Sequence, residues 1–118
     1  GEVAMADTIF SRIMAREISA DIVFEDDDAL AFRDIDAKAP THVLVIPKRH
    51  IATVADASHE NAAMLGSLLV TAARVASDLG LSEDGYRLVI NHGRDGGQTV
   101  EHLHIHILGG RPMAWPPG

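Results

Sequence analysis

The 118-residue sequence contains no cysteine, which excludes disulfide bonds, thiolate nucleophiles and cysteine-bound metals. Basic residues are also scarce: 10 Lys and Arg stand against 17 Asp and Glu, and the formal net charge is −7. Such a charge opposes non-specific binding to nucleic acid or to an anionic membrane. It does not exclude a single mononucleotide, because a few local donors and backbone amides suffice to hold one phosphate.

Long hydrophobic runs are absent as well. No stretch approaches the ~20 apolar residues that a transmembrane helix needs. Residues 1–5 have neither the basic start nor the apolar core of a signal peptide. We therefore expect a cytoplasmic protein, for which the lack of cysteine is suitable. Met5 is interpreted as the natural start, and residues 1–6 are expected to form a flexible N-terminus.

The composition is otherwise that of an ordered globular protein. Hydrophobic residues make up 47% of the chain and charged residues 23%, a mixture that can offset the entropy cost of folding. A chain of 118 residues fits one domain and is too short for two domains of usual size. A single domain over residues 1–118 must therefore hold the whole functional site.

Apolar residues at helical spacing predict two helices. The shorter spans residues 7–17, with Asp7 or Thr8 as its N-cap. The longer spans residues 58–79, with Ser58 as N-cap and Gly80 as a left-handed C-terminal stop. The long helix is expected to pack across a sheet through the stripe Leu65, Leu68, Leu69, Ala72, Ala73, Ala76 and Leu79.

Runs of β-branched and aromatic residues predict five strands, at residues 22–25, 29–33, 42–47, 86–91 and 100–108. The first two are joined by an acidic turn at residues 26–28, and the last two by a glycine-rich link at residues 93–99. Residues 109–118 form a Pro-rich C-terminal arm. Because consecutive strands are followed by one helix, the sequence predicts an α+β domain with a mainly antiparallel sheet.

Three histidines alternate with aliphatic residues in His102-Leu103-His104-Ile105-His106-Ile107-Leu108. The period of a strand would place all three imidazoles on one face, about 6 to 7 Å apart at Cα. Three close imidazolium ions would repel one another, so some of these rings must be neutral at pH 7. Neutral imidazole can act as a nucleophile or as a metal ligand.

Two other interpretations of this segment stay open on the residues alone. The histidines can simply be the polar face of a half-exposed strand, or they can share a zinc ion with His50 or Asp34 completing the site. The nearby glycines favour a phosphate, because backbone amides can turn inward as an anion cradle, although an ordinary hairpin would look the same. The sequence has no Walker motif, dinucleotide fingerprint or Gly-x-Ser-x-Gly elbow, so histidine is the only well-presented nucleophile.

Residues 102–108 closely resemble the motif of the histidine triad family. The resemblance runs from residue 7 to the C-terminus, and the tail Trp115-Pro116-Pro117-Gly118 is similar to the Hint branch of that family. Other matching segments are Asp7-Thr8-Ile9-Phe10, Phe24-Glu25-Asp26-Asp27, Ala39-Pro40-Thr41-His42, Val45-Ile46-Pro47-Lys48 and Asp95-Gly96-Gly97-Gln98. The resemblance implies a HIT-like fold and a homodimer that joins two sheets into a continuous ten-stranded one.

The resemblance also implies a purine nucleoside phosphoramidase. Such an enzyme hydrolyses the P–N bond between AMP or GMP and an amine, as in AMP-lysine, without a metal or other cofactor. His104 would attack phosphorus and form a nucleotidyl-histidine intermediate, and His106 would contact the phosphate oxygens. His102 and His50 would orient and polarise the nucleophile.

The same resemblance implies a set of nucleotide-binding residues. Gly97, Gln98 and Thr99 would hold the phosphate or the bridging atom, and Asp34 would bind the ribose hydroxyls. The remaining contacts would be Ile35 and Asn91 beside ribose and phosphate, a base pocket of Phe10, Ile13, Ile18 and Phe32, and Trp115 reaching the partner subunit's site. From the residues alone, the apolar four equally fit an ordinary core, Asp34 a turn cap and Asn91 a strand end.

The remaining histidines and three charged positions complete the expectations. His42, His59 and His92 are expected to be structural or surface residues. Glu101, Arg94 and His92 depart from the family pattern beside the site, which affects substrate preference and pH optimum. Two other functions are also compatible with the sequence: a non-catalytic nucleotide-binding protein, and a metal-dependent hydrolase built on the three histidines of the triad.

Overall fold

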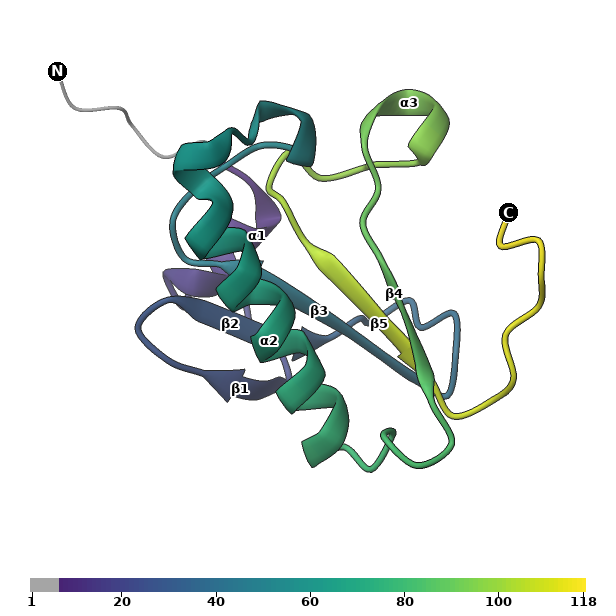
Figure 1. Ribbon diagram of the computed structural model, residues 1–118. Helices are drawn as coiled ribbons and strands as arrows, with labels where there is room; N and C mark the ends of the chain where they lie inside the picture. Colours follow the sequence, from purple (N-terminus) through teal and green to yellow (C-terminus); the bar gives the residue numbers. More distant parts are fainter. Residues whose placement is uncertain (1–6) are drawn as a thin grey trace, which may run out of the picture.

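The computed structural model describes residues 7–118 (Figure 1), so the expected flexible N-terminus at residues 1–6 lies outside the described residues. In chain order the elements are α1 (Ile9–Met14), β1 (Ile22–Glu25), β2 (Ala29–Arg33), β3 (Thr41–Pro47), η1 (Val54–Asp56), η2 (His59–Asn61), α2 (Ala62–Asp78), β4 (Tyr86–Val89), α3 (Gly93–Gly96) and β5 (Ile105–Gly109). The two η elements are short 3₁₀ turns that lead into α2.

The five strands form one sheet in the order β1-β2-β3-β5-β4, and every neighbouring pair is antiparallel. The predicted five-stranded antiparallel sheet is therefore confirmed. The acidic turn between β1 and β2 is also present: the Asp26 carboxylate accepts hydrogen bonds from the backbone N–H groups of Asp28 and Ala29, both at 2.8 Å. This local contact explains why the reversal falls at the Asp run.

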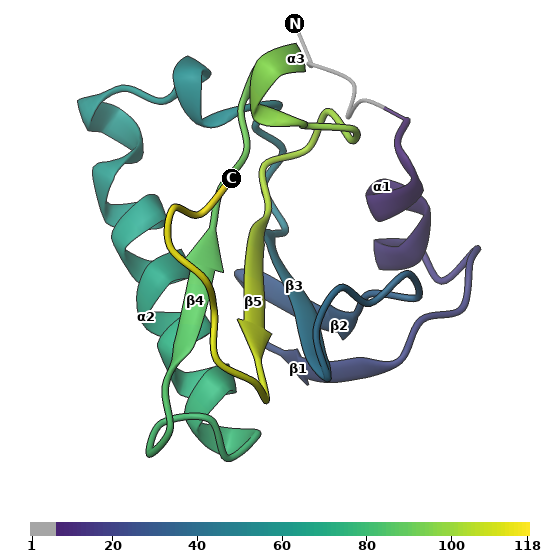
Figure 2. The ribbon, with the colours of Figure 1, turned by 90° about the vertical axis from the view of Figure 1, so that its right-hand side faces the viewer.

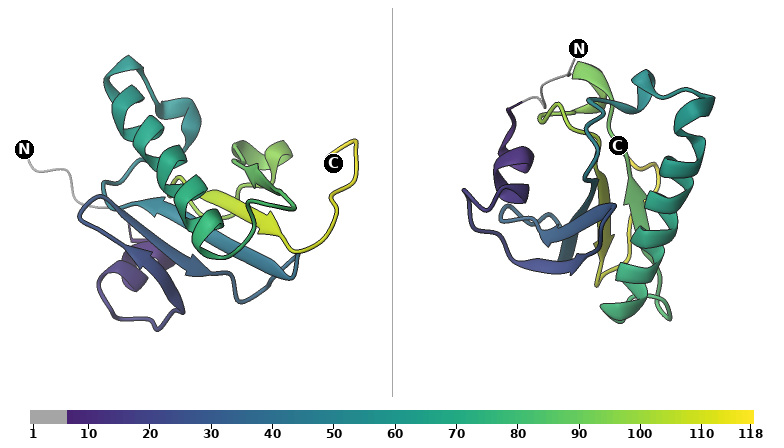
Figure 3. Two further views of the ribbon diagram at one scale, coloured as in Figure 1. Left: turned by 60° about the horizontal axis from the view of Figure 1, so that its bottom comes forward. Right: turned by 90° about the vertical axis from the view of Figure 1, so that its left-hand side faces the viewer.

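Helices cover the two faces of the sheet unequally. The 17-residue α2 lies across one face and the 6-residue α1 lies against the other (Figures 2 and 3). Alternate residues of β2 and β3 therefore reach different cores. The core under α2 includes Ala31, Val43, Val45 and Ile107, whereas the core under α1 is formed by Phe10, Ile13, Leu30, Phe32, Leu44 and Ile46.

The ends of the helices follow the capping expectations in part. Thr8 caps α1 in a reciprocal arrangement with Ser11. Ser58 caps the 3₁₀ turn η2, and α2 itself begins only at Ala62. Gly80 has the left-handed φ of +79° that was expected at the end of the long helix.

The predicted stripe of the long helix was partly wrong. Leu68, Ala72 and Ala76 are buried as expected, but Leu69 is 45% exposed and Ala73 is also exposed. Val75 is buried instead. The contact with the sheet follows spacings of three and four residues centred on Leu68, Ala72 and Val75, which turns Leu69 and Ala73 toward the outer side of the helix.

The prediction of a strand over residues 100–108 was wrong in its first half, because β5 begins at Ile105. Its partner β3 ends at Pro47, which has no N–H to continue the ladder. The N–H of Leu103 instead donates to the carbonyl of Ile51, at 2.7 Å. The glycine-rich link also differs from a plain connection, since residues 93–96 form the short helix α3.

The C-terminal arm has no regular structure, as expected, and runs beside β4 (Figure 2). The Arg87 guanidinium donates to the carbonyl of Ala114 at 2.9 Å and lies 5.8 Å from the centre of the Trp115 ring. Trp115 is 81% exposed. Among residues 7–118, no helix has the length and apolar character required to cross a bilayer.

Candidate active site

A cavity of about 460 Å³ lies on the α1 side of the sheet. Predicted site residues that line it are Phe10, Ile13, Ile18, Phe32, Asp34, Ile35, Thr99, His104 and His106. His50, His102, Asn91, Gly97, Gln98 and Trp115 are not among the residues that line it. The structure thus brings two of the three triad histidines and the expected apolar residues to one cavity.

His104 is held in one orientation by the main chain. It is 6% exposed, and its Nδ1 lies 2.6 Å from the carbonyl oxygen of His102. Because a carbonyl oxygen can only accept, Nδ1 must carry the proton, and Nε2 of the neutral ring then keeps its lone pair. The ring therefore has a free basic nitrogen and lines the cavity.

His102 is fully buried and connects two further groups. Its Nε2–H donates to the carbonyl of Pro47 at 2.8 Å, which leaves Nδ1 as an acceptor. The Nδ1 of His50 lies 3.3 Å from that Nδ1 and can donate to it. His102 therefore contributes to the site of His104 through its backbone carbonyl, while its ring is fixed by Pro47 and His50.

His42 is the main functional candidate that the sequence analysis missed. It is 5% exposed, and its Nδ1 accepts the backbone N–H of Lys38 at 3.0 Å. Its Nε2 must then carry the proton, which it donates to Nδ1 of His106 at 2.9 Å. This leaves the proton of His106 on Nε2, a buried atom without a hydrogen-bond partner in the described residues.

A sequence signal for His42 exists in the alternation of β3. His42, Leu44 and Ile46 share one face of that strand, and Leu44 pairs directly with His106 in β5. Detecting it requires knowing that β3 is the neighbour of β5, which the sequence alone does not state.

Burial lowers the pKa values of four of these histidines below the ordinary value of 6.5. Removal from water is the largest cause for His42, His102 and His104, and the same cause lowers the pKa of His106 to about 4. The neighbouring His104 and His42 lower the pKa of His106 further. All four rings are therefore neutral at pH 7, which agrees with the proton positions required by their hydrogen bonds.

Phe10 of α1 packs edge-on against the histidines. Its ring centre lies 5.0 Å from that of His104, 6.1 Å from that of His102 and 5.5 Å from that of Phe32. These contacts keep water from one side of the His102 and His104 rings and so contribute to the burial that lowers their pKa values.

The glycine-rich link at residues 93–99, called the glycine-containing loop from here on, reaches the cavity at Thr99. The side-chain amide of Gln98 donates to the carbonyls of Ala52 and Val100, at 2.8 and 2.9 Å. Only Oε1 of Gln98 is left for a ligand, and this atom accepts hydrogen bonds. Gly97 has a left-handed φ of +83°, which a residue with a Cβ would adopt only with strain.

Asp34 also lines the cavity. One carboxylate oxygen accepts the N–H of Asp36 at 2.9 Å, and the other lies 3.5 Å from Nε2 of His42. Asp34, His42 and His106 offer ligand atoms within 4.8 Å of one another and form the set in residues 7–118 that could share a metal ion. This set differs from the His102, His104 and His106 set considered on sequence grounds.

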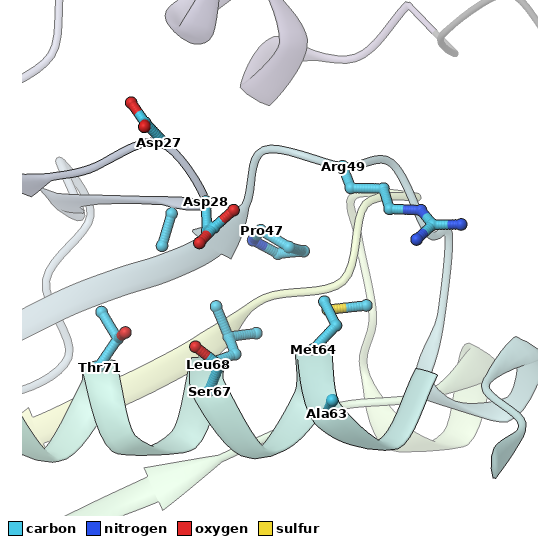
Figure 4. A pocket seen from close by; sticks show the side chains of 10 residues that line it. Asp27, Asp28, Pro47, Arg49, Ala63, Met64, Ser67, Leu68 and Thr71 are labelled. Carbon is cyan, nitrogen blue, oxygen red and sulfur yellow. The ribbon is translucent and has the colours of Figure 1, made fainter. Parts of the chain in front are cut away.

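A second hollow of about 380 Å³ lies on the other side of the sheet, between the β1–β2 turn and α2 (Figure 4). Asp28, Arg49 and Met64 are among the residues that line it, and none of the predicted site residues does. The convergence of histidines is therefore specific to the α1 side.

A family model described as the HIT domain matches residues 15–113. Because this match spans well over half of the sequence, the chain belongs to the HIT family. The predicted histidine triad membership is thereby confirmed.

The chain is also similar to individual members of that family. It is 53% identical over 107 residues to the purine nucleoside phosphoramidase of Escherichia coli K12, covering 91% of this chain and 90% of the relative. An uncharacterised HIT-like protein of Synechococcus elongatus is 61% identical over 112 residues, covering 95% of this chain and 97% of the relative. The crystal structure of a HIT family hydrolase from Legionella pneumophila superposes with a TM-score of 0.92 at 52% identity, covering 95% of this chain and 100% of that chain.

Proposed function

We propose that this protein hydrolyses the P–N bond of purine nucleoside phosphoramidates and that His104 is the nucleophile. One observation carries the proposal: the unprotonated Nε2 of His104 and the proton-bearing, unpartnered Nε2 of His106 belong to neighbouring rings of one cavity, 4.9 Å apart at their centres. A nucleophile and a hydrogen-bond donor side by side are what attack on a phosphoryl group requires. A 53%-identical relative is named as a purine nucleoside phosphoramidase, which supports the substrate class.

The nucleotide would lie across the cavity from α1 to the glycine-containing loop. The purine base would lie among Phe10, Ile13, Ile18 and Phe32, and Asp34 would accept hydrogen bonds from the ribose hydroxyls. Ile35 and Asn91 would flank ribose and phosphate. The phosphate would meet Thr99 and the backbone N–H of Gly97, while Oε1 of Gln98 would accept from the bridging nitrogen.

The reaction would proceed in two displacements at phosphorus. Nε2 of His104 would attack, the P–N bond to the amine would break, and the amine nitrogen would take a proton from solvent as it leaves. His106 would donate from Nε2 to a phosphate oxygen as negative charge develops there. Water would then displace His104 from phosphorus, which releases the nucleoside monophosphate, returns one proton to solvent and restores the neutral ring.

The other histidines would position these two. The carbonyl of His102 would hold the proton of His104 on Nδ1, while His50 and Pro47 fix the ring of His102. His42 would hold the proton of His106 on Nε2. Since imidazoles and backbone amides supply every group that the steps need, we propose that the reaction is independent of metal and cofactor. We also propose that it takes place in the cytoplasm, which suits a chain without cysteine.

We also propose that the protein is a homodimer in which β4 pairs with its copy to give a ten-stranded sheet. In the described part of the chain β4 has one neighbour, β5, and so presents an open edge. Leu69, Val70 and Trp115 add exposed apolar surface that a partner would cover, and Trp115 would then reach the partner's site. Sedimentation equilibrium is expected to give twice the mass of the chain, and the mass of one chain would refute the dimer.

Hydrolysis of AMP joined to a fluorescent amine through a P–N bond tests the function, with wild type and His104→Ala compared in the presence of a chelator. Wild type is expected to turn over, and His104→Ala to lose at least ~10⁴-fold in turnover while still binding AMP. Activity that disappears with chelation would favour a metal-dependent hydrolase. Binding of AMP without turnover by wild type would favour a nucleotide-binding protein.

A further inference from the structure

The segment that carries the proposed phosphate site has little regular structure of its own. Residues 97–104, all within the described part of the chain, lie in no helix or strand, although they include Thr99 and His104. Their positions therefore depend on contacts with another part of the chain. Those contacts are made by residues 47–53, the last residue of β3 and the segment after it, which we call the strut.

The strut makes five hydrogen-bonded contacts with residues 92–104. The carbonyl of Pro47 accepts from His102, that of Ile51 from Leu103 and that of Ala52 from Gln98, at 2.8, 2.7 and 2.8 Å. The other two join side chains: Nδ1 of His50 to Nδ1 of His102 at 3.3 Å, and the hydroxyl of Thr53 to Nδ1 of His92. The strut and the loop around α3 meet at the same end of the sheet (Figure 1).

The Thr53–His92 contact joins two side chains, as the His50–His102 contact does, but it holds the residue just before α3 rather than a residue of the triad. Thr53 is 8% exposed and directly precedes η1, a position where a threonine hydroxyl commonly caps a helix, yet it makes no capping bond. His92 directly precedes α3 and likewise makes no capping bond. Both side chains are used instead to join two loops that lie 39 residues apart in the sequence.

We propose that Thr53 and His92 are a positioning pair that fixes the start of the glycine-containing loop, while Ala52 and Gln98 fix its end, so that the loop faces the substrate phosphate. The two anchors are consecutive residues of the strut, and residues 93–97 lie between the points that they hold. A loop held at both ends keeps the amide of Gly97 and the side chain of Thr99 in place before substrate arrives. This role rests on the proposed phosphoramidate hydrolysis.

The test uses the intact protein and replaces the Thr53 hydroxyl. Thr53→Val removes the hydroxyl at nearly constant volume, and Thr53→Ser keeps it. Thr71→Val is the matched control, because Thr71 lies on α2 beside the second hollow (Figure 4). Each variant is assayed for AMP affinity by calorimetry, for kcat and KM on the AMP–amine conjugate, and for backbone amide exchange of residues 93–99.

Thr53→Val is expected to lower kcat/KM and AMP affinity by about fivefold, the scale of one hydrogen bond, and to speed exchange in residues 93–99. Thr53→Ser and Thr71→Val are expected to behave as wild type. Combining Thr53→Val with His92→Ala is expected to be no worse than either change alone, because both remove the same contact.

Two results would overturn the positioning pair while the proposed function stands. They are wild-type affinity and turnover in Thr53→Val, and an equal loss in Thr53→Ser, which would assign the effect to shape. If wild type itself neither binds AMP nor cleaves the conjugate, the proposed function fails instead. The exchange rates of residues 93–99 then decide by themselves whether the pair orders the loop.

Discussion

Neighbouring residues of β5 reach two different environments, and the contrast between the two faces of the sheet explains how the chain divides stability from chemistry. Ile105 and Ile107 point toward α2 into a core of aliphatic side chains, whereas His106 points to the α1 side. A 17-residue helix closes the first face, and a 6-residue helix leaves a cavity on the second. The shorter cover leaves room for a ligand, and the longer one provides packing that the histidine face cannot supply.

The largest effect on the α2 face is expected from Ile107→Ala. Ile107 is fully buried, and its truncation is expected to lower the free energy of unfolding by about 2 to 5 kcal/mol, through lost transfer energy and a cavity. Turnover per folded molecule should stay within a few-fold of wild type, because the side chain faces away from His106. Urea unfolding and a kcat measurement check both halves. A large fall in kcat with unchanged stability would mean that the two faces are not separate.

On the histidine face we expect His42→Leu to affect turnover more than stability. Without His42 the proton of His106 is no longer held on Nε2, and kcat is expected to fall by roughly 10²-fold, as for the loss of a positioned proton donor. His59→Leu is the control, because His59 is an exposed residue of η2. Wild-type turnover by His42→Leu would remove His42 from the mechanism.

The buried histidines should also make stability depend on pH. Their pKa values are lowered in the folded protein, that of His106 to about 4, so below pH 6.5 the unfolded chain binds protons that the folded protein does not. The free energy of unfolding is therefore expected to fall as pH drops from 6.5 toward 4. Urea unfolding between pH 7 and pH 5 measures this slope above the range in which carboxylates titrate.

The variant His106→Asn should show a shallower dependence over the same range, since it removes the ring whose pKa is lowered to about 4. His59→Gln is expected to keep the wild-type slope. Equal slopes in all three proteins would assign the pH dependence to groups other than His106.

The smallest effect is expected at the cap of α1. Thr8→Ala removes one partner of the reciprocal contact with Ser11 and should lower the free energy of unfolding by about 1 kcal/mol. Thr8→Ser retains the hydroxyl and should restore most of the loss. No change in Thr8→Ala would mean that packing of Phe10 and Ile13 alone holds α1 on the sheet.

Local patterns predicted much of this architecture. Strands β1 and β2 have the predicted bounds, because alternation and the Asp26 turn are contained within a dozen residues. The triad histidines were located for the same reason. The side chains of Leu103 and His104 already point to opposite faces of the sheet, although β5 begins only at Ile105.

What the sequence did not reveal depends on contacts between distant segments. The start of β5 depends on where β3 ends and on the bond from Leu103 to Ile51. His42 became a candidate only when β3 was found beside β5, and Thr53 only when its loop was found against His92. Helix and strand periodicity carry no information about such pairings.

The hydrogen bonds that fix the histidine protons determine which changes of sequence the site can tolerate. His102 donates to the main chain of Pro47, His104 donates to the main chain of His102, and His42 accepts from the main chain of Lys38. Apart from proline, which lacks the N–H, every amino acid provides the same peptide group, so substitutions that preserve the path of the backbone leave these proton positions intact. Natural variants should therefore tolerate exchange of the Lys38 side chain far better than insertions or deletions between β2 and β3.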